Sequence, residues 1–251
     1  MSSCSRHRWA AWLSGCFLLA SLHSQTPVSP PPKPIEFLQY GVEWRLVRAG
    51  TAQLARTAEE PSGWENNLIL QSSGLISKLY RVNDNYRVQY DSSFCAATTF
   101  MRAEEGSRRR EAAVTFKEQK SAYLERDTVK NRVVLQKELD IAPCTHDVIA
   151  ALYRLRAARL APGQSIQLPI SDGKRMVNAR VDAQEKETVK TPTGSYQAIR
   201  HEAHLFNDVL YARKGRLFLW LTDDDKRLPV QIRLKMNFPV GAITLQLEKT
   251  I

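Results

Sequence analysis

The sequence predicts a mainly β (α+β) fold: a curved antiparallel sheet or open barrel of about ten strands, with one amphipathic helix packed on its apolar face. Three observations lead to this fold class. Apolar and polar residues alternate with period two in several segments, turn-forming residues separate these segments, and a single longer segment has helical periodicity. A large sheet exposes its edges unless it curls or is covered, so we expect strong curvature.

The N-terminal residues 1–24 predict a secretory signal peptide. They contain Arg6 and Arg8, no acidic residue, an apolar run over residues 9–22 and a polar exit. This run of about 14 residues is shorter than the roughly 20 that span a bilayer, although an uncleaved anchor remains an alternative. Lipidation at Cys16 is a second alternative, which we disfavour because the apolar run continues beyond that cysteine. We therefore expect a periplasmic protein.

After this leader, the composition predicts a spacer and one domain. Five prolines within residues 25–34 favour an extended Pro-rich spacer without a packed core. Residues 35–251 then form a single β-rich domain of about 215 residues, a length that all-β folds often reach. We expect no transmembrane segment in the mature chain.

The charge balance narrows the expected partners. The whole chain has a formal net charge of +10, but acidic and basic residues are interspersed, which is typical of a solvated surface. A basic exported protein can favour anionic lipid or wall polymer, whereas nucleic acid is not expected in this compartment. Lipid, lipoprotein or wall polymer are therefore the expected partners, and the sequence leaves the oligomeric state open.

Two cysteines remain after the leader: Cys95 and Cys144. In an oxidising compartment we expect them to form a disulfide. Closing a loop of about 50 residues contributes roughly 4 kcal/mol in the chain-entropy model. Two buried free thiols are the alternative. The spacing fits neither a zinc motif nor a Cys-x-x-Cys redox centre.

Strand periodicity is clearest in four segments: residues 38–46, 133–141, 228–236 and 243–247. Each places apolar residues at every second position, with Lys137 as an exception, which is typical of half-buried antiparallel strands. Turn-forming residues between strand-like segments indicate further hairpins. These turns lie at residues 104–107, 171–173, 192–194 and 222–225.

One segment has the periodicity of an amphipathic helix. Its apolar residues are spaced i, i+3, i+4 and i+7: Val148, Ala151, Leu152 and Leu155. We expect Thr145 to cap its start and the Pro162-Gly163 pair to end it. A shorter helical turn is possible at residues 75–79. The helix would lie on the concave apolar face of the sheet, where either a solid core or a pocket for an acyl chain can form; we favour the solid core.

Two histidine-containing motifs are candidates for a catalytic or metal site. His201 and His204 are three apart on an expected strand, so they point to opposite faces and cannot share an ion as a zinc-protease pair does. His146 and Asp147, at the expected helix start, are candidates for acid–base work, but helix-end polar residues explain them more simply. No Gly-x-Ser-x-Gly elbow or Gly-rich phosphate loop is present.

Two charge clusters are interpreted as structural. The aspartates at residues 223–225 lie where a hairpin turn is expected, and no further acidic ligands follow at calcium-loop spacing. Arg108, Arg109 and Arg110 leave a turn into a strand, so the middle arginine points away from the other two, and a solvated face is favoured over an anion site. We therefore assign no catalytic, cofactor or metal site, and expect no enzyme activity.

Several segments together resemble a known family. They are residues 147–156 (DVIAALYRLR), 191–196 (TPTGSY), 220–230 (WLTDDDKRLPV), 49–52 (AGTA) and 239–241 (PVG). On these segments the chain resembles, over most of residues 37–247, the exported bacterial family catalogued as domain of unknown function 3108. The resemblance implies a Gram-negative periplasmic or envelope-facing protein of mostly β structure. It transfers no catalytic residue, because the family has no established activity.

The expected function is non-enzymatic binding of an apolar or amphipathic envelope component. The expected shape is also similar to that of periplasmic lipoprotein carriers, although this is an analogy of fold alone. A hydrolase acting on an envelope polymer, using His146, Asp147 or the aspartates at 223–225, is one alternative. A structural partner in an envelope complex, which docks a protein on an edge strand, is the other. A cavity above roughly 300 Å³ with apolar walls would favour ligand binding.

Overall fold

The computed structural model describes residues 33–59, 63–237, 239 and 241–251. The predicted signal peptide (residues 1–24), Cys16 and most of the predicted spacer (residues 25–34) lie outside the described residues. From Lys33 onward the described residues form one compact unit.

Fourteen strands and two helices occur in the described part of the chain. In chain order they are β1 (Glu36–Trp44), β2 (Val47–Glu59), β3 (Gly63–Ser72), α1 (Gly74–Leu79), β4 (Val82–Asp91), β5 (Ala96–Glu105), β6 (Arg108–Lys117), β7 (Lys120–Asp127), β8 (Arg132–Asp140), α2 (Val148–Ala158), β9 (Ser165–Ser171), β10 (Met176–Thr191), β11 (Gly194–Ala203), β12 (Gly215–Thr222), β13 (Pro229–Met236) and β14 (Ala242–Thr250).

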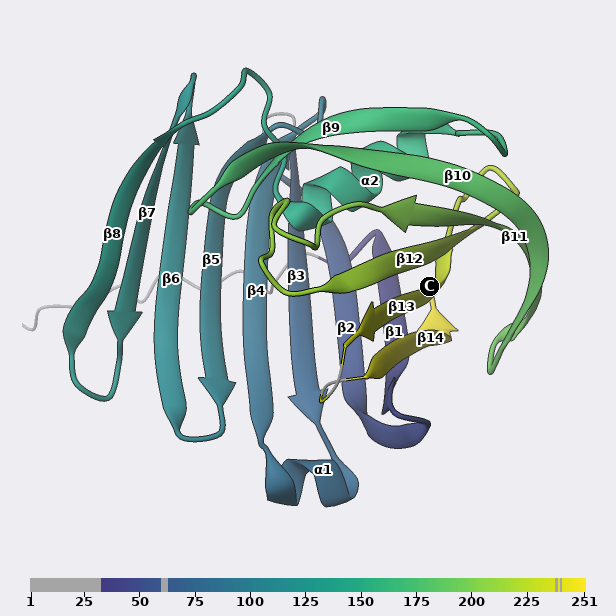
Figure 1. Ribbon diagram of the computed structural model, residues 1–251, viewed down its shortest axis with the longest axis horizontal. Coiled ribbons are helices and arrows are strands. Elements are labelled where there is room, and N and C mark those ends of the chain that lie inside the picture. Colours follow the sequence, from purple (N-terminus) through teal and green to yellow (C-terminus); the bar gives the residue numbers. More distant parts are fainter. Residues whose placement is uncertain (1–32, 60–62, 238, 240) are drawn as a thin grey trace, which may run out of the picture. The chain divides into compact units, whose positions relative to one another are not determined.

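All fourteen described strands belong to one antiparallel sheet (Figure 1). Its order is β8-β7-β6-β5-β4-β3-β2-β1-β14-β13-β12-β11-β10-β9. Each half is a meander in which consecutive strands pair, and the pairing of β1 with β14 joins the two halves. The edge strands β8 and β9 do not pair with each other, so the sheet is open, as expected, and not a closed barrel.

The sheet has more strands than the sequence predicts. The expectation of about ten rested on segments with strict alternation. Several missed strands alternate poorly because neither face is fully buried; β3 and β4 are half-buried at most positions. The segment predicted at residues 133–141 is a strand, β8, but it is exposed along almost its whole length and not half-buried. In such strands the ladder of backbone hydrogen bonds, which any sequence can make, determines the structure more than side-chain pattern does.

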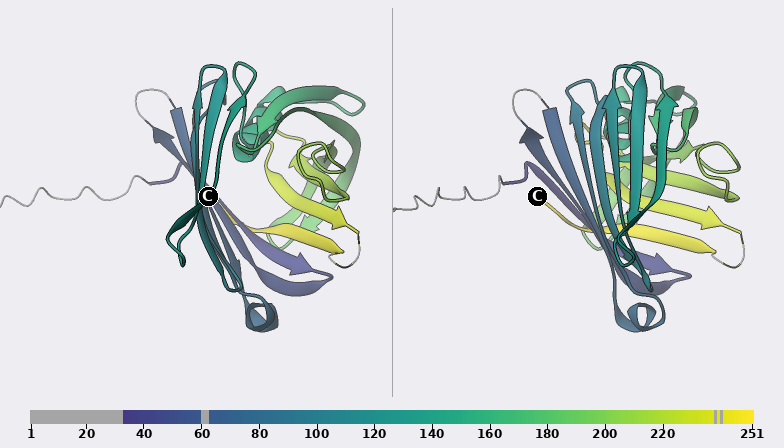
Figure 2. Two further views of the ribbon diagram at one scale, coloured as in Figure 1. Left: turned by 60° about the vertical axis from the view of Figure 1, so that its left-hand side comes forward. Right: turned by 90° about the vertical axis from the view of Figure 1, so that its left-hand side faces the viewer.

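The sheet curls until its two halves face each other (Figure 2, left). The strands from β1 to β8 form one wall, and those from β9 to β14 curve round to oppose it. Register shifts mark bulges in several strand pairs, among them one between Ala183 and Lys186 in the long strand β10. Bulges increase local twist and bend a strand, which is how a long sheet acquires such curvature.

Helix α2 lies on the concave face of this sheet (Figure 1). It contains the four apolar residues that the sequence predicted for the helix, but both of its ends differ from expectation. Asp147, not Thr145, is the N-cap, and the helix ends at Ala158, with Arg159 in the left-handed conformation, before Pro162 is reached. The predicted shorter turn at residues 75–79 is α1, which connects β3 to β4.

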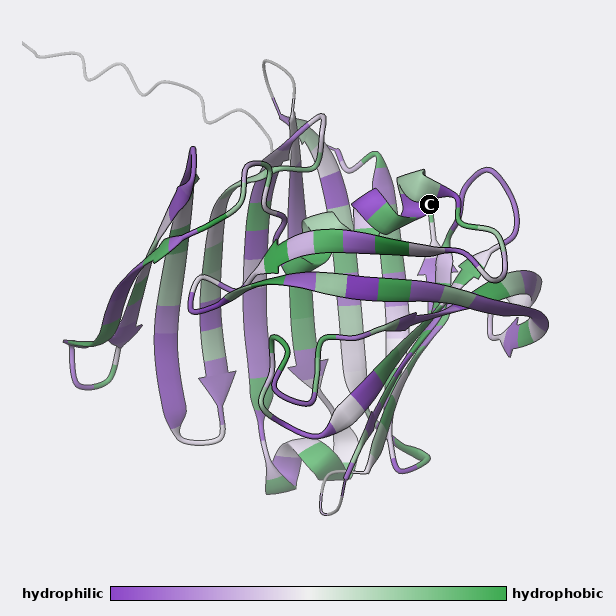
Figure 3. Cartoon of the chain, turned by 45° about the horizontal axis from the view of Figure 1, so that its top comes forward, coloured by the Kyte–Doolittle hydropathy of each residue, from purple (hydrophilic) through white to green (hydrophobic). Residues whose placement is uncertain are grey.

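Buried apolar residues form three clusters. The largest joins α2 to strands on both sides of the β1–β14 pairing, and includes Leu38, Val88, Tyr153, Trp220 and Leu247. The second packs α2 against β9 to β12, and the third lies between β5–β7 and the β9–β10 hairpin. Alternating hydropathy along strands such as β9 and β10 is visible in Figure 3.

Candidate functional site

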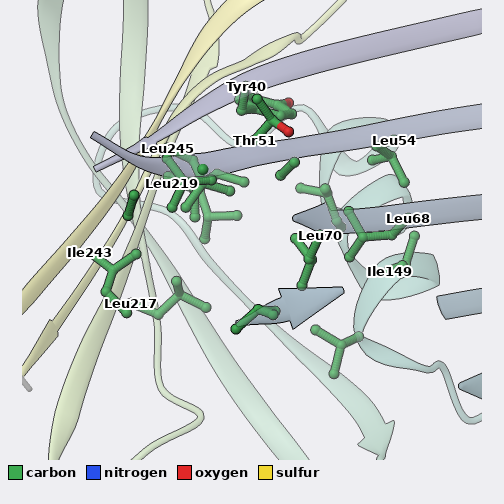
Figure 4. A pocket seen from close by; sticks show the side chains of 18 of the residues that line it. Tyr40, Thr51, Leu54, Leu68, Leu70, Ile149, Leu217, Leu219, Ile243 and Leu245 are labelled. Atoms are coloured by element: carbon green, nitrogen blue, oxygen red, sulfur yellow. The ribbon is translucent and has the colours of Figure 1, made fainter. Parts of the chain in front are cut away.

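A large pocket occupies the part of the concave face that α2 leaves uncovered (Figure 4). Its volume is about 1110 Å³, and it is partly open to solvent. Its walls come from β1–β6, α1, α2 and the strands of the second half of the sheet. Labelled apolar wall residues include Leu54, Leu68, Leu70, Ile149, Leu217, Leu219, Ile243 and Leu245.

This pocket replaces the solid core that the sequence interpretation favoured. A helix of 11 residues is about 16 Å long, whereas β2, with 13 residues, extends for about 43 Å. Helix α2 lies across the strands of the first wall and therefore leaves much of the length of β2 uncovered (Figure 1). Most wall side chains beyond the helix are aliphatic. Among the polar ones, the Tyr40 hydroxyl already donates a hydrogen bond to the carbonyl oxygen of Pro229, at 2.8 Å.

A buried polar network fixes α2 beside this pocket. The Tyr153 hydroxyl donates to Glu36 at 2.7 Å and accepts from the Asn66 amide at 3.1 Å. Asn66 is fully buried, and its side-chain oxygen accepts from the Tyr90 hydroxyl at 2.5 Å. Arg156, one turn further along the helix, makes two hydrogen bonds to Glu36, at 2.8 and 2.7 Å. The network thus ties one side of α2 to β1, β3 and β4.

The network also determines the charge state of its acid. Burial would raise the pKa of Glu36, but the hydrogen bonds and the positive charge of Arg156 outweigh burial and hold this pKa below its usual value. Glu36 is therefore ionised at neutral pH and balances Arg156. The sequence interpretation missed this network because its members are far apart along the chain. The one available signal was Asn66, a residue type that strands disfavour, inside a strand.

His146 and Asp147 lie at the N-terminus of α2 and stabilise it. The Asp147 carboxylate accepts hydrogen bonds from the backbone amides of Ile149 and Ala150, at 3.1 and 2.7 Å, and from the Tyr86 hydroxyl at 3.0 Å. His146 is buried, and its Nδ1 lies 2.6 Å from the carbonyl oxygen of Phe94. Burial lowers the pKa of His146 and raises that of Asp147. Neither residue lines the pocket.

Cys95 and Cys144, the pair expected from the sequence, form a disulfide in the structure. The bond connects the start of β5 to the segment that leads into α2, three residues before the Asp147 cap. The same region is held by backbone hydrogen bonds between His146 and β9. The N-terminus of α2 is therefore tied to both halves of the sheet.

The other two motifs form local structure. Asp224 closes the β12–β13 turn by accepting from the backbone amides of Lys226 and Arg227, each at 3.0 Å, as predicted for a turn. His201 is buried, while His204 is exposed and lies 2.8 Å from Asp182, so the two histidines do not converge. In the described part of the chain, no group of three or more His, Cys, Asp or Glu side chains is placed to hold a metal ion.

The side chains of the arginines at 108–110 point alternately to the two faces of β6, as the strand geometry predicts. Arg108 and Arg110 line the pocket, whereas Arg109 does not, and lies 3.7 Å from Glu104. The expectation of a purely solvated face was therefore incomplete. Alternation along β6 was enough to separate the three side chains, but only the curling of the sheet places two of them beside an apolar pocket.

Comparison with known proteins identifies the family and the fold. The model of the DUF3108 family, described as a protein of unknown function, matches residues 39–248. No curated protein matches the chain. A β-barrel-like protein of the domain of unknown function DUF1849 from Brucella abortus has a TM-score of 0.58 at 10% identity, covering 87% of this chain and 98% of its own. That likeness extends to the fold and no further.

Two further solved structures are similar at lower scores. A candidate exported protein with a YmcC-like fold from Bacteroides fragilis has a TM-score of 0.33 at 9% identity, covering 88% of this chain and 97% of its own. A candidate lipoprotein from Parabacteroides distasonis has a TM-score of 0.32 at 9% identity, with the same coverage. Separately, none of the described helices is both long and apolar enough to cross a membrane.

Proposed function

Because this chain belongs to the DUF3108 family, whose function is unknown, we propose a function from the pocket itself: non-enzymatic binding of an apolar or amphipathic component of the cell envelope. The observation that carries the proposal is the pocket of about 1110 Å³ on the concave face. Pockets for small molecules are typically about 300–1,000 Å³, so this one has room for a ligand at the upper end of that range or beyond.

The chemistry of the walls supports a hydrocarbon ligand. Aliphatic side chains from β3, α2 and β12–β14 converge on the pocket. Burying a methylene group contributes about 0.8 kcal/mol, so an acyl chain gains affinity along its whole length without any specific polar contact. Water in such a pocket finds few hydrogen-bond partners and is easily displaced by the chain.

Binding is preferred to hydrolysis because the candidate acid–base residues already have structural roles. Asp147 caps α2, His146 contacts the carbonyl of Phe94, and the aspartates at 223–225 belong to a turn. A hydrolase would need titratable groups that converge on the bound substrate. The proposal places the protein in the periplasm, where an oxidising environment suits the Cys95–Cys144 disulfide.

A second candidate function is docking of an envelope partner on the edge strand β8. This strand pairs on one side only, with β7, and is exposed along almost its whole length. Its exposed apolar residues are Val133, Val134 and Leu135. An exposed strand edge can pair with an added strand from a partner. Val134→Pro would weaken such docking, measured by crosslinking in isolated envelopes, and leave ligand binding unchanged.

The main proposal is tested with a neutral dye on the purified mature protein. Nile red fluoresces in apolar surroundings, and 1-palmitoylglycerol should displace it from the pocket. Leu217→Trp fills the pocket with an apolar ring and Leu70→Asp places a charge on its wall, so each should weaken dye binding by about tenfold or more. The matched control is Val134→Asp on β8, remote from the pocket, which should bind like the wild type.

Folding of each variant is checked by circular dichroism before binding is measured. Undiminished dye binding in a folded Leu217→Trp protein, or no displacement by 1-palmitoylglycerol in the wild type, would overturn the proposal. Equal losses in the pocket variants and in Val134→Asp would also overturn it, because the dye would then report general surface binding.

A further inference from the structure

The charged residues of the pocket wall gather at a few positions. They are Glu105 at the end of β5, Arg108 and Arg110 at the start of β6, and Arg213 in the segment before β12. The remaining wall residues carry no formal charge. The β5–β6 turn lies at the same end of the sheet as α1 (Figure 1), and Tyr80, just after α1, lines the pocket as well. The apolar pocket therefore carries arginines at two places on its wall, the start of β6 and the segment before β12.

Two of these arginines have no counter-charge. Arg110 pairs with Glu105 at 2.8 Å and lies 3.6 Å from Glu125, so its charge is already balanced. The side chains of Arg108 and Arg213, both exposed, make no ion pair or hydrogen bond with any residue that the structure describes. By contrast, Arg109, the neighbour that faces away from the pocket, lies 3.7 Å from Glu104.

The two guanidinium groups lie beside apolar pocket walls. Low-dielectric walls screen a charge less than water does, so an anion beside the pocket is attracted more strongly than one on an open surface. A guanidinium also matches phosphate and carboxylate groups with two parallel N–H donors, which a neutral glycerol cannot use in the same way.

We propose that the pocket binds amphipathic molecules with an anionic headgroup: the hydrocarbon chain occupies the aliphatic interior, and an arginine of the wall, Arg108 or Arg213, holds a phosphate or carboxylate. This inference rests on the proposed function and adds the class of ligand. It also accounts for the unbalanced arginines, which a pocket for neutral lipid would not need.

The test compares ligands that share one chain and differ in the headgroup. Displacement of Nile red is measured with 1-palmitoylglycerol, 1-palmitoyl-lysophosphatidate and palmitate. The wild type should bind the lysophosphatidate about tenfold more tightly than the neutral glycerol, and raising the salt to about 0.5 M should weaken only the anionic ligands. The ratio between lysophosphatidate and palmitate tells whether phosphate or carboxylate is the preferred headgroup.

Substitutions test whether these two arginines cause the preference for anionic over neutral ligands. Arg108→Gln/Arg213→Gln should bring the anionic ligands to within about twofold of the neutral one and leave the neutral affinity unchanged. Arg109→Gln is the matched control and should keep the wild-type preference. Equal wild-type affinity for the charged and neutral ligands would overturn the headgroup inference alone, since the proposed pocket binding would stand. Failure of 1-palmitoylglycerol to displace the dye would instead overturn the proposed function.

Discussion

The two sides of helix α2 meet the same curved sheet in different ways. On one side, Tyr153 and Arg156 make hydrogen bonds to Glu36 and Asn66, and this part of the molecule is filled. On the other side, Ala151 and Leu155 line the pocket and make only apolar contacts with the sheet. We call these the anchored side and the pocket side.

The difference shows how a fold can keep an apolar pocket open. Apolar contacts are non-directional, so they would let a helix slide into whatever space is left. Hydrogen bonds are directional and, in a buried network, costly to leave unmade. The anchored side therefore sets where α2 lies, and the pocket side stays unfilled because the helix cannot move towards it.

The largest expected effect on the free energy of unfolding comes from removing the disulfide that precedes α2. The double variant Cys95→Ala/Cys144→Ala opens a loop with a sequence separation of 49 residues. Its free energy of unfolding should fall by about 4 kcal/mol in the chain-entropy model. Urea unfolding, followed by circular dichroism, measures this loss. Reduced wild-type protein should lose a similar amount, and a loss below about 1 kcal/mol would mean that the disulfide is unimportant for the anchored side.

The next effect comes from removing one partner of the buried ion pair. Arg156 and Glu36 have side-chain exposures of 11% and 19%. Arg156→Met leaves an acid without its partner and should cost about 3 kcal/mol. The control is Arg159→Met, at the residue that follows the same helix, whose pair with Asp225 is largely exposed and should contribute little to stability. Equal losses, measured by urea unfolding, would contradict the distinction between buried anchor and solvated pair.

Two leucines of α2 line the pocket and differ in how deeply they are buried. Leu155 is 3% exposed, and Leu155→Ala should cost about 3 kcal/mol. Leu152 is half-buried, so Leu152→Ala should cost only about 1 kcal/mol. Thermal and urea unfolding check both values. If Leu152→Ala were as costly as Leu155→Ala, the wall around Leu152 would be packed in solution and the pocket would not be open there.

The smallest expected effect concerns the cap of α2 and depends on pH. Burial raises the pKa of Asp147 above its unfolded value, despite its hydrogen bonds to backbone amides. The native state then holds a proton that the unfolded chain has released, so this group's contribution to stability is present below about pH 4 and is lost as pH rises through the folded pKa. Asn also caps helices well. Asp147→Asn should therefore gain stability relative to wild type as pH rises to 7.

Unfolding measured at pH 4 and pH 7 tests this sign. Thr145→Val is the control, because Thr145 is not the cap and donates only to the carbonyl oxygen of Ala142. Its difference from wild type should not change with pH. A relative loss of stability for Asp147→Asn at pH 7 would mean that the charged carboxylate is the better cap.

The sequence by itself determined the fold class, the family resemblance and the local elements. Period-two alternation, turn residues and a single helical repeat are short-range signals, so they predict antiparallel strands, the hairpin at residues 222–225 and the body of α2. Local signals were weaker at the ends of elements. Thr145 and Asp147 are both good caps, and only the position of the first helical turn distinguishes them.

Only the tertiary structure decided whether the concave face is filled. That outcome depends on how far the sheet curls and on how much of it an 11-residue helix can cover. It also depends on a network that joins Glu36, Asn66, Tyr90 and Arg156 from four separate elements. No period along the chain records such long-range distances. For the same reason the sequence separates Arg108 from Arg109 but cannot place Arg108 and Arg213 beside one pocket.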